Sequence, residues 1–335
     1  MAEAAQALVE ATDIARYFDV SKPALARLIA REPRRTLRAV DGVSFTIPKG
    51  RTLALVGESG CGKSTVARMV VGLYRPTRGR MVFDGLDVTN PESRGSGRGS
   101  IRRRMQMIFQ DPYASLNPRW RVGDTIAEPL HAFGEAGGRS GAEQHVARLL
   151  TQVGLSPADA EKFPHEFSGG KRQRVSIARA LASQPEFLVC DEPTSALDVS
   201  VQAQILNLMK DLQAEFGLTY LFISHNLAVV RHMSDVVGVM YLGRIVETAP
   251  AETVFTTPRH PYTRMLMDAL PDIAMTGRAR VPVGGEVPNP IAPPTGCHFH
   301  PRCPLANDRC RRESPSLREA AGTKVACHAV EEGRA

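Results

Sequence analysis

Residues 57–64, which read GESGCGKS, are the segment of this chain that is most specific for one kind of chemistry. Backbone N–H groups can wrap closely around phosphates only where glycine permits the approach and the dihedral angles. Lys63 would neutralise the terminal phosphates, and Ser64 would offer its hydroxyl to Mg²⁺. Cys61 is expected to fill the loop rather than to act as a nucleophile, because no base is implied beside it. We therefore predict a nucleotide phosphate site that comprises Gly57, Ser59, Gly60, Cys61, Gly62, Lys63, Ser64 and Thr65.

Two adjacent acids, Asp191 and Glu192, follow the apolar run FLVC at residues 187–190. A carboxylate at the tip of a buried strand is costly unless a cation meets it. Asp191 is therefore predicted to face Mg²⁺, and Glu192 to polarise an attacking water molecule, although Asp191 alone could also be a helix N-cap. His225 follows the apolar run YLFI at residues 220–223, where it could touch the terminal phosphate or be an ordinary core histidine.

Three apolar runs are expected to form the strands that position these side chains. Residues 52–56, 187–190 and 220–223 show no polar alternation, which is typical of strands buried on both faces of a parallel sheet. Residues 201–217 have apolar residues on one helical face and end in glycine, which predicts a helix between the last two strands. This order indicates a βαβ unit and an α/β fold. Residues 36–56 are expected to form two strands around a turn.

The composition is that of a folded protein without a membrane-spanning helix. The chain has 335 residues, of which 43% are hydrophobic, so about two domains or one large domain with an appendage are expected. It has no run of 18 apolar residues and no basic residue before Arg16, which argues against a membrane helix and a secretory signal and predicts a cytoplasmic location. The net charge of +7 permits nucleic acid or an anionic membrane surface as a partner, but a solvated arginine-rich surface explains it more simply.

The chain between about residues 8 and 250 resembles the nucleotide-binding subunit of an ABC transporter. The segment GESGCGKS is similar to the Walker A motif of that family, and FLVCDE to the Walker B motif with its catalytic glutamate. SGGK at residues 168–171 resembles the signature motif, Gln110 the Q-loop, SALD at residues 195–198 the D-loop, and His225 the switch histidine. Each motif occurs once and in the order found in the family.

This resemblance implies the architecture of the chain. We expect a P-loop NTPase fold with a RecA-like core and an N-terminal antiparallel β subdomain, in an ATPase domain of residues 1–255. A helical subdomain is expected at about residues 112–180, where it would dock the membrane partner.

The resemblance also implies how ATP and Mg²⁺ are held. In the family, ATP lies between two subunits, so Ser168, Gly169 and Gly170 of one chain would bind the γ-phosphate held by the other, and Asp198 would act across the same interface. Ser64, Gln110 and Asp191 would serve Mg²⁺, while Lys63, Glu192 and His225 would be catalytic. Phe18 is favoured over Tyr17 as the aromatic residue that stacks on adenine. Lys171 stands where the family usually has glutamine, which is expected to preserve function with an altered affinity for ATP.

Four further segments resemble the dipeptide and oligopeptide importers: MIFQDPYASLNPRW, KFPHEFSGG, SALDVSVQAQILNLM and HPYTRMLMDALP. Nickel, glutathione and related importers belong to the same subfamily, so the cargo stays open. The resemblance implies an ATPase coupled to solute import, bound peripherally at the cytoplasmic face of the inner membrane. Its implied partners are two integral-membrane permease subunits, a second ATP-binding subunit and a separate solute-binding protein. A paralogous second subunit is expected, and a homodimer is the alternative.

Residues 256–335 are expected to form a separate, irregular extension, because prolines and four of the six cysteines gather there. Four thiols in a turn-rich segment suggest a staple. Disulfides are disfavoured in the cytoplasm, zinc usually has closer cysteine pairs, an iron–sulfur cluster tolerates wider loops, and unliganded thiols are also possible. The resemblance implies a structural [4Fe–4S] cluster, with Zn²⁺ as the alternative because histidines lie beside the cysteines. The candidate ligands are Cys297, Cys303, Cys310 and Cys327.

A soluble ABC-type ATPase that acts on nucleic acid or ribosomes is the alternative function. Such proteins usually carry two cassettes in one chain or a long coiled coil, whereas this chain has one Walker A motif, one signature motif and no heptad array. The importer subunit is therefore preferred, and no specific nucleic acid partner is expected.

Overall fold

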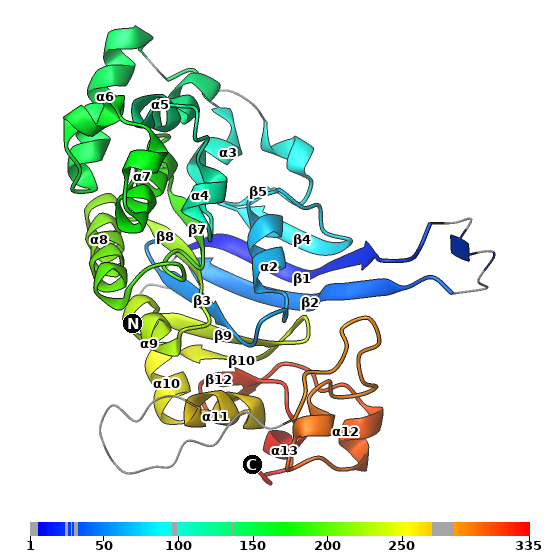
Figure 1. Cartoon of the computed structure of the whole chain (residues 1–335). Helices are drawn as coiled ribbons and strands as arrows, with labels where there is room; N and C mark the ends of the chain where they lie inside the picture. Colours follow the sequence, from blue (N-terminus) through cyan, green and yellow to red (C-terminus); the bar gives the residue numbers. More distant parts are fainter. Residues whose placement is uncertain are drawn as a thin grey trace.

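The computed structural model describes residues 6–23, 26–27, 29, 33–95, 99–135, 137–269 and 285–335. Two β-sheets, a group of helices on one side and a C-terminal segment on the other make up the molecule (Figure 1).

The smaller sheet is antiparallel, with the strand order β2-β1-β4-β5, as expected for the N-terminal part of the chain. Alternate residues of β2 are buried, which places one face of this sheet against the core and the other in solvent. Its strands are β1 (Ala7–Asp19), β2 (Thr36–Pro48), β4 (Arg78–Phe83) and β5 (Leu86–Asp87).

The larger sheet has the order β11-β12-β10-β9-β3-β8-β7-β6, and the five strands from β9 to β6 run parallel. Every residue of β3, β7 and β8 is buried, which confirms the three strands predicted from continuous apolar runs. The two strands expected over residues 36–56 also form, but β2 and β3 belong to different sheets. The strands of this sheet are β3 (Thr52–Val56), β6 (Met105–Ile108), β7 (Phe187–Asp191), β8 (Thr219–Ile223), β9 (Val236–Tyr241), β10 (Arg244–Pro250), β11 (Arg318–Ala320) and β12 (Thr323–Val325).

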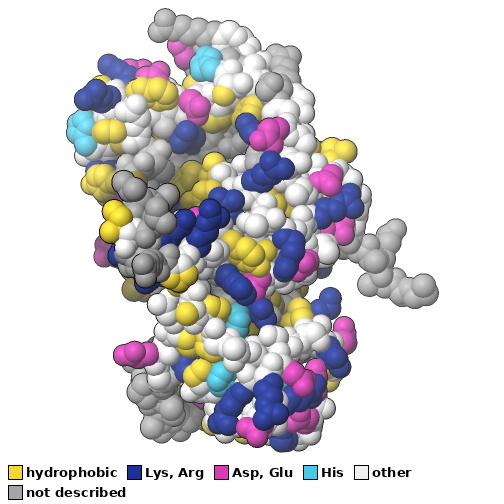
Figure 2. Space-filling view, turned by 90° about the vertical axis from the view of Figure 1, so that its right-hand side faces the viewer, with side chains coloured by type: hydrophobic (Ala, Val, Ile, Leu, Met, Phe, Trp, Pro, Cys, Tyr) yellow, Lys and Arg dark blue, Asp and Glu magenta, His cyan; other side chains and the backbone are white. Residues whose placement is uncertain are grey.

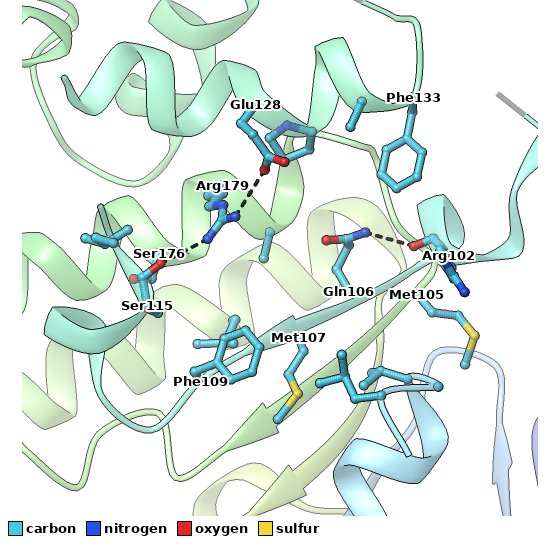
Figure 3. Close-up of a pocket in the computed structure, with 18 residues that line it drawn as sticks. Arg102, Met105, Gln106, Met107, Phe109, Ser115, Glu128, Phe133, Ser176 and Arg179 are labelled. Carbon is cyan, nitrogen blue, oxygen red and sulfur yellow. Dashed lines mark hydrogen bonds and ion pairs between the residues drawn. The ribbon is translucent and has the colours of Figure 1, made fainter. Parts of the chain in front are cut away.

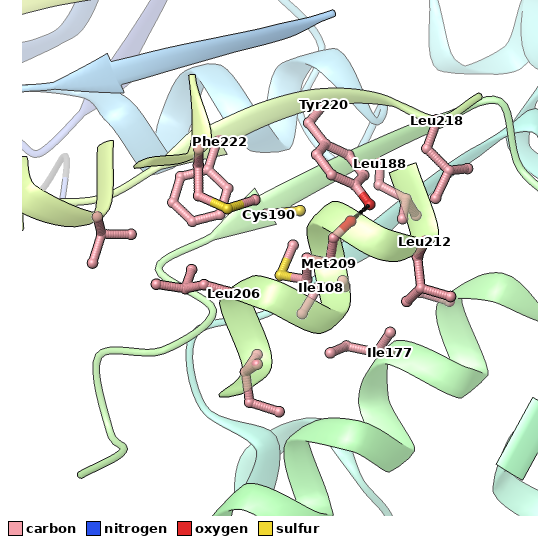
Figure 4. Packing of buried hydrophobic residues seen from close by; sticks show 14 of the residues in the cluster. Ile108, Ile177, Leu188, Cys190, Leu206, Met209, Leu212, Leu218, Tyr220 and Phe222 are labelled. Atoms are coloured by element: carbon pink, nitrogen blue, oxygen red, sulfur yellow. Dashed lines mark hydrogen bonds between the residues drawn. The ribbon is translucent and has the colours of Figure 1, made fainter. Parts of the chain in front are cut away.

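Helix α8 (Val199–Phe216) is the crossover predicted between β7 and β8, and it ends at Gly217, which has φ 64°. Figure 4 shows its apolar face against the two strands, where the hydroxyl of Tyr220 donates a hydrogen bond of 2.8 Å to the carbonyl of Met209. The other helices beside the core sheet are α2 (Lys63–Val70), α3 (Ile101–Arg104), α9 (Leu227–Met233), α10 (Ala251–Thr256) and α11 (Pro261–Asp268).

The helical group at the upper left of Figure 1 lies between β6 and β7 in the sequence. It contains α4 (Pro112–Ser115), α5 (Val122–Ala132), α6 (Gly138–Gln152) and α7 (Gly169–Leu181), with two 3₁₀ turns, η3 (Pro157–Glu161) and η4 (Pro164–Glu166). Across the described part of the chain, no helix combines the length and the apolar character needed to cross a bilayer.

The C-terminal segment contains more regular structure than its composition predicted. Its strands β11 and β12 form a hairpin, and β12 pairs with β10, so the segment extends the central sheet. Phe299 and Tyr262 are fully buried within the main hydrophobic core. The segment also holds a 3₁₀ turn η5 (His300–Arg302) and the short helices α12 (Asp308–Arg312) and α13 (His328–Glu331).

Candidate nucleotide-binding and catalytic site

The phosphate loop connects β3 to α2, in the strand–loop–helix context that the sequence predicted. Gly57 has φ 148° and Gly62 has φ 108°, values that residues with a side chain rarely adopt. A Cβ atom at Gly57 would lie 2.2 Å from the carbonyl oxygen of Met240, and one at Gly62 would lie 2.2 Å from that of Ala39. Both glycines are therefore required by the close approach of neighbouring backbone as well as by the loop conformation.

Lys63 points back across the loop that precedes it. Its Nζ donates hydrogen bonds of 2.8 Å and 3.0 Å to the carbonyl oxygens of Gly57 and Glu58, and the residue is buried. Both acceptors are neutral, and no carboxylate among the described residues forms an ion pair with the ammonium group. The group can therefore exchange these carbonyl oxygens for the oxygens of a phosphate. Burial raises the pKa of the Cys61 thiol, which fits a filler and not a nucleophile.

Ser64 and Asp191 meet where the carboxyl end of β7 faces the start of α2. The Ser64 hydroxyl donates a hydrogen bond of 2.9 Å to Oδ1 of Asp191. Asp191 is buried, and this burial raises the pKa of its carboxyl, while the hydrogen bond from Ser64 opposes the shift. A hydroxyl beside a buried carboxylate provides the oxygen ligands that Mg²⁺ prefers, so these two residues fit the cation.

Glu192 lies between the Q-loop glutamine and His225, the second residue after β8. Its Oε2 accepts a hydrogen bond of 2.9 Å from Nε2 of Gln110 and lies 3.2 Å from Nδ1 of His225. Glu192 has φ 50°, a strained backbone conformation for a residue with a side chain. The strands β6, β7 and β8 therefore deliver these three side chains to one point, as parallel neighbours do at their carboxyl ends.

A cavity of about 670 Å³ gathers most of the residues predicted to bind nucleotide. Asp191 and Gly57 lie next to it, because Asp191 is hydrogen-bonded to Ser64 and Gly57 to Lys63. Cys61 lies between Gly60 and Gly62, which both line the cavity. The predicted residues that line the cavity are Phe18, Ser59, Gly60, Gly62, Lys63, Ser64, Thr65, Gln110, Glu192 and His225.

Ser168, Gly169, Gly170 and Asp198 do not line this cavity. Ser168 and Asp198 are exposed at the N-termini of α7 and α8, and neither side chain caps its helix. The two helix ends pack together, because a Cβ atom at Gly170 would lie 2.4 Å from the side chain of Val201. The signature residues thus form a second surface on the same chain.

The aromatic residues Tyr17 and Phe18 point to different places. The Tyr17 hydroxyl donates a hydrogen bond of 2.5 Å to Asp41, whereas Phe18 lines the cavity. The Phe18 ring contacts Tyr74 edge-on, with ring centroids 5.5 Å apart, and the Arg16 guanidinium lies 4.7 Å from its centroid. Of the two residues, Phe18 is the one positioned for a base that enters the cavity.

The C-terminal segment also contributes to this site, which the sequence alone did not predict. Pro290 lines the nucleotide cavity together with Leu37 and Ala39. Arg302 forms an ion pair with Glu58 of the phosphate loop, with Nη1 and Oε2 2.7 Å apart. Glu58, an acid inside a loop built to receive phosphates, was the available signal that a cation must lie nearby.

The four cysteines of the C-terminal segment lie near one another. Burial raises the pKa of Cys297 to about 11, and the three other thiols of the segment add to this shift. In the described part of the chain, however, no three His, Cys, Asp or Glu side chains are grouped so that they could hold a metal ion. The donor chemistry therefore suits a metal while the arrangement does not, and the expected iron–sulfur cluster is not confirmed.

A second cavity, of about 460 Å³, lies between the helical group and the edge strand β6 (Figure 3). Arg179 of α7 reaches across it, donating hydrogen bonds of 3.1 Å to Glu128 and to the carbonyl oxygen of Ser115. Phe109 and Phe133 add apolar surface to its lining. Phe109 lines this cavity, and the next residue, Gln110, lines the nucleotide cavity, so the two sites adjoin along the chain.

Charged side chains of both signs alternate over the C-terminal segment, the lower part of Figure 2. Arg309 alone forms ion pairs with Glu313, Glu331 and Glu332. The net positive charge of the chain is therefore not concentrated on this part of the surface.

The chain matches two family profiles: "ABC transporter" over residues 40–195 and "Oligopeptide/dipeptide transporter, C-terminal region" over residues 246–310. It is 48% identical to the oligopeptide transport ATP-binding protein AppF of Bacillus subtilis, over 96% of this chain and 97% of that protein. It is also 48% identical to the di/tripeptide transport ATP-binding protein DppF of Pseudomonas aeruginosa, over 98% of this chain and 99% of that protein.

Among solved structures, a dimer of the ATP-binding cassette MJ0796 bound to ADP and phosphate is similar with a TM-score of 0.61 and 25% identity, over 72% of this chain and 98% of that one. The cbiO1 protein from Clostridium perfringens, part of the ABC transporter complex cbiONQ, is similar with a TM-score of 0.60 and 25% identity, over 75% of this chain and 91% of that one. The chain therefore belongs to the ABC transporter family, in the group of oligopeptide and dipeptide transport ATP-binding proteins.

Proposed function

We propose that this chain is the ATP-hydrolysing, energy-coupling subunit of an importer for dipeptides or oligopeptides. The observation that carries the proposal is the gathering of Lys63, Ser64, Glu192 and His225 around one cavity in a chain whose close relatives are named as peptide transport ATP-binding proteins. Nickel, glutathione or another peptide-like solute is the alternative cargo, because the ATP-binding subunit does not contact the cargo itself.

Within the site, each residue has a distinct role. The loop amides and Lys63 would hold the phosphates, and Phe18 would stack on the base. Ser64, Asp191 and Gln110 would hold Mg²⁺, which neutralises charge on the phosphates. Glu192 would accept a proton from the attacking water. His225 would move from the Glu192 carboxylate to bind the γ-phosphate.

The active unit is a pair of ATP-binding subunits. Ser168, Gly169, Gly170 and Asp198 lie outside the nucleotide cavity of their own chain. Ser168 and Asp198 are exposed and the two glycines are partly exposed, which leaves all four available to a second subunit. The N-terminus of α7 would bind the γ-phosphate held by that subunit. A paralogous partner is proposed, and a homodimer is the alternative.

The cavity between the helical group and β6 is proposed as the place where a permease subunit docks. It combines apolar side chains with the charged pair Arg179 and Glu128, and it adjoins Gln110. A change at the γ-phosphate could therefore move this surface through the Q-loop. Two permeases would place the subunit at the cytoplasmic face of the inner membrane, with a solute-binding protein on the opposite side.

For the C-terminal thiols, a [4Fe–4S] cluster remains a proposal, with Zn²⁺ as the alternative. It is supported by the presence of four cysteines in one segment and by the effect of neighbouring thiols, which raise the pKa of Cys297 and Cys303. Iron, zinc and acid-labile sulfide should be measured per chain after anaerobic purification. Cys303→Ser should lower the metal content, whereas Cys190→Ala in the core should not; a chain without metal would exclude the cluster.

The function is tested by identifying what co-purifies with the tagged chain from membranes of its own host in mild detergent. Two permeases, a second ATP-binding subunit and a solute-binding protein are expected, and the ligand of that last protein would name the cargo. Recovery with ribosomes or nucleic acid would contradict the proposal.

A further inference from the structure

Each polar group of Glu58, the second residue of the phosphate loop, has a defined partner. Its backbone N–H donates a hydrogen bond of 3.0 Å to the Tyr262 hydroxyl. Its carbonyl oxygen accepts a hydrogen bond of 3.0 Å from Lys63. Its carboxylate accepts two hydrogen bonds from Arg302, of 2.7 Å and 3.0 Å. Two of these three partners lie outside the loop, 204 and 244 residues away in the sequence.

Arg302 is held firmly enough to fix the carboxylate that it binds. Its side chain is 2% exposed, and Nη1 also donates a hydrogen bond of 3.4 Å to the Tyr241 hydroxyl. Gly285 packs against it so closely that a Cβ atom there would lie 3.2 Å from Cγ of Arg302. A guanidinium that binds a carboxylate through two parallel hydrogen bonds sets its orientation as well as its distance.

Tyr262 is fixed by a small aromatic cluster. Its ring lies 4.7 Å from that of Tyr241 and 5.4 Å from that of Phe299, measured between centroids. All three side chains are almost completely buried. The Tyr262 hydroxyl, which accepts the hydrogen bond from the Glu58 N–H, therefore belongs to a side chain with little freedom to move.

We propose that Arg302 and Tyr262 are positioning residues of the ATP site, which hold Glu58 so that the phosphate loop has its nucleotide-binding shape before ATP arrives. This inference rests on the proposed ATP-binding role of the loop. A loop that is already ordered does not lose that conformational freedom when the ligand binds. Without Arg302 or Tyr262 the loop is less ordered before ATP binds. Part of the binding free energy must then be used to order it, so the affinity for ATP falls.

The alternative is that these contacts only attach the C-terminal segment to the rest of the protein. In that case, loss of Arg302 or Tyr262 lowers thermal stability but leaves nucleotide affinity unchanged. The two explanations are separated by measuring ATP binding and stability on the same variants of the full-length chain.

The experiment compares Arg302→Gln and Tyr262→Phe with Arg309→Gln as the matched control. Arg309 is an arginine of the same segment that pairs with Glu313, Glu331 and Glu332, far in sequence from the loop. Dissociation constants are measured with a fluorescent ATP analogue, KM and kcat by phosphate release, and folding by thermal denaturation.

Arg302→Gln should raise the dissociation constant by about tenfold or more, because it leaves the Glu58 carboxylate without its cation. Tyr262→Phe should raise it by about three- to fivefold, the factor expected for one neutral hydrogen bond. KM should rise by more than kcat falls, and Arg302→Lys should recover part of the affinity. Arg309→Gln should stay within about twofold of the wild type.

Dissociation constants within twofold of the wild type for both Arg302→Gln and Tyr262→Phe would overturn the inference. Where Arg302→Gln does not fold, Tyr262→Phe and Glu58→Gln decide. Tyr262→Phe removes one hydrogen bond, Glu58→Gln removes the negative charge that Arg302 binds, and both keep the shape of the side chain. The double variant Glu58→Gln, Arg302→Gln should bind ATP no more weakly than the worse single variant if the two residues act as a pair. A wild-type chain that bound no ATP would instead contradict the proposed function.

Discussion

Replacing Glu192 with glutamine should separate ATP binding from ATP hydrolysis. The Glu192 carboxylate accepts a hydrogen bond of 2.9 Å from Gln110 and lies 3.2 Å from Nδ1 of His225. An amide has the same shape but cannot take the proton of the attacking water. Loss of a general base lowers a rate by about 10²- to 10⁴-fold, equivalent to about 3–5 kcal/mol in the activation barrier.

The same substitution should have a small effect on folding. The amide oxygen can still accept one hydrogen bond, so at most one of the two contacts is lost, at a cost of about 1 kcal/mol. The affinity for ATP should be unchanged or higher, because the phosphate loop is intact and a negative charge beside the phosphates has been removed. A loss of hydrolysis therefore cannot be attributed to a loss of folding or binding.

The assay measures phosphate release and binding of a fluorescent ATP analogue, with Mg²⁺ present, on the wild type, Glu192→Gln and Glu215→Gln. Glu215 is exposed on α8 and provides the same chemical change away from the site. Phosphate release by Glu192→Gln at the wild-type rate would refute the assigned role of Glu192.

Three further results are expected. Ser64→Ala removes the hydroxyl that contacts Asp191 and should raise the Mg²⁺ concentration for half-maximal hydrolysis about tenfold, as a Mg²⁺ titration would show. Gly57→Ala places a Cβ atom 2.2 Å from the Met240 carbonyl and should cost about 2 kcal/mol or more in urea unfolding; a wild-type midpoint would disprove the close approach. Burial lowers the pKa of His260 to about 3, so the unfolded chain binds a proton that the folded chain does not, and stability should fall by about 1.4 kcal/mol per pH unit below about pH 6.5. His260→Asn keeps a helix cap without this titration, and its unfolding free energy should be less sensitive to pH between pH 6.5 and 4.5; an equal slope would contradict the assignment.

The sequence predicted the local parts of the site because each part is encoded within a short stretch. The buried strand, glycine loop and helix around Lys63 are contiguous, and so are strand β7 and the acids that follow it. Once the parallel strands were predicted, their carboxyl ends had to lie at one edge of the sheet. The cavity that joins Lys63, Glu192 and His225 follows from these two facts.

Pairings between distant segments could not be predicted in the same way. Strand β2 reads as a neighbour of β3, yet it pairs with β1 in another sheet, because the hydrogen-bonding partner of a strand depends on the whole chain. The contact between Glu58 and Arg302 joins residues 244 positions apart, and no local pattern encodes it. The regular structure of the C-terminal segment was also missed, because its short strands are stabilised by pairing with β10 and not by their own composition.

That pairing has a consequence for the solubility of shortened forms of the protein. β12 covers β10 through the register of Glu247 with Val325 and Thr248 with Lys324, and the Ala326 amide donates a further hydrogen bond of 2.8 Å to the Val246 carbonyl. Without β12, the backbone groups of β10 would form an open sheet edge, which is a template for pairing with another molecule. Pairing with β12 therefore protects β10 from edge-to-edge aggregation. A chain that stops before β11 should self-associate even where its ATP site is complete.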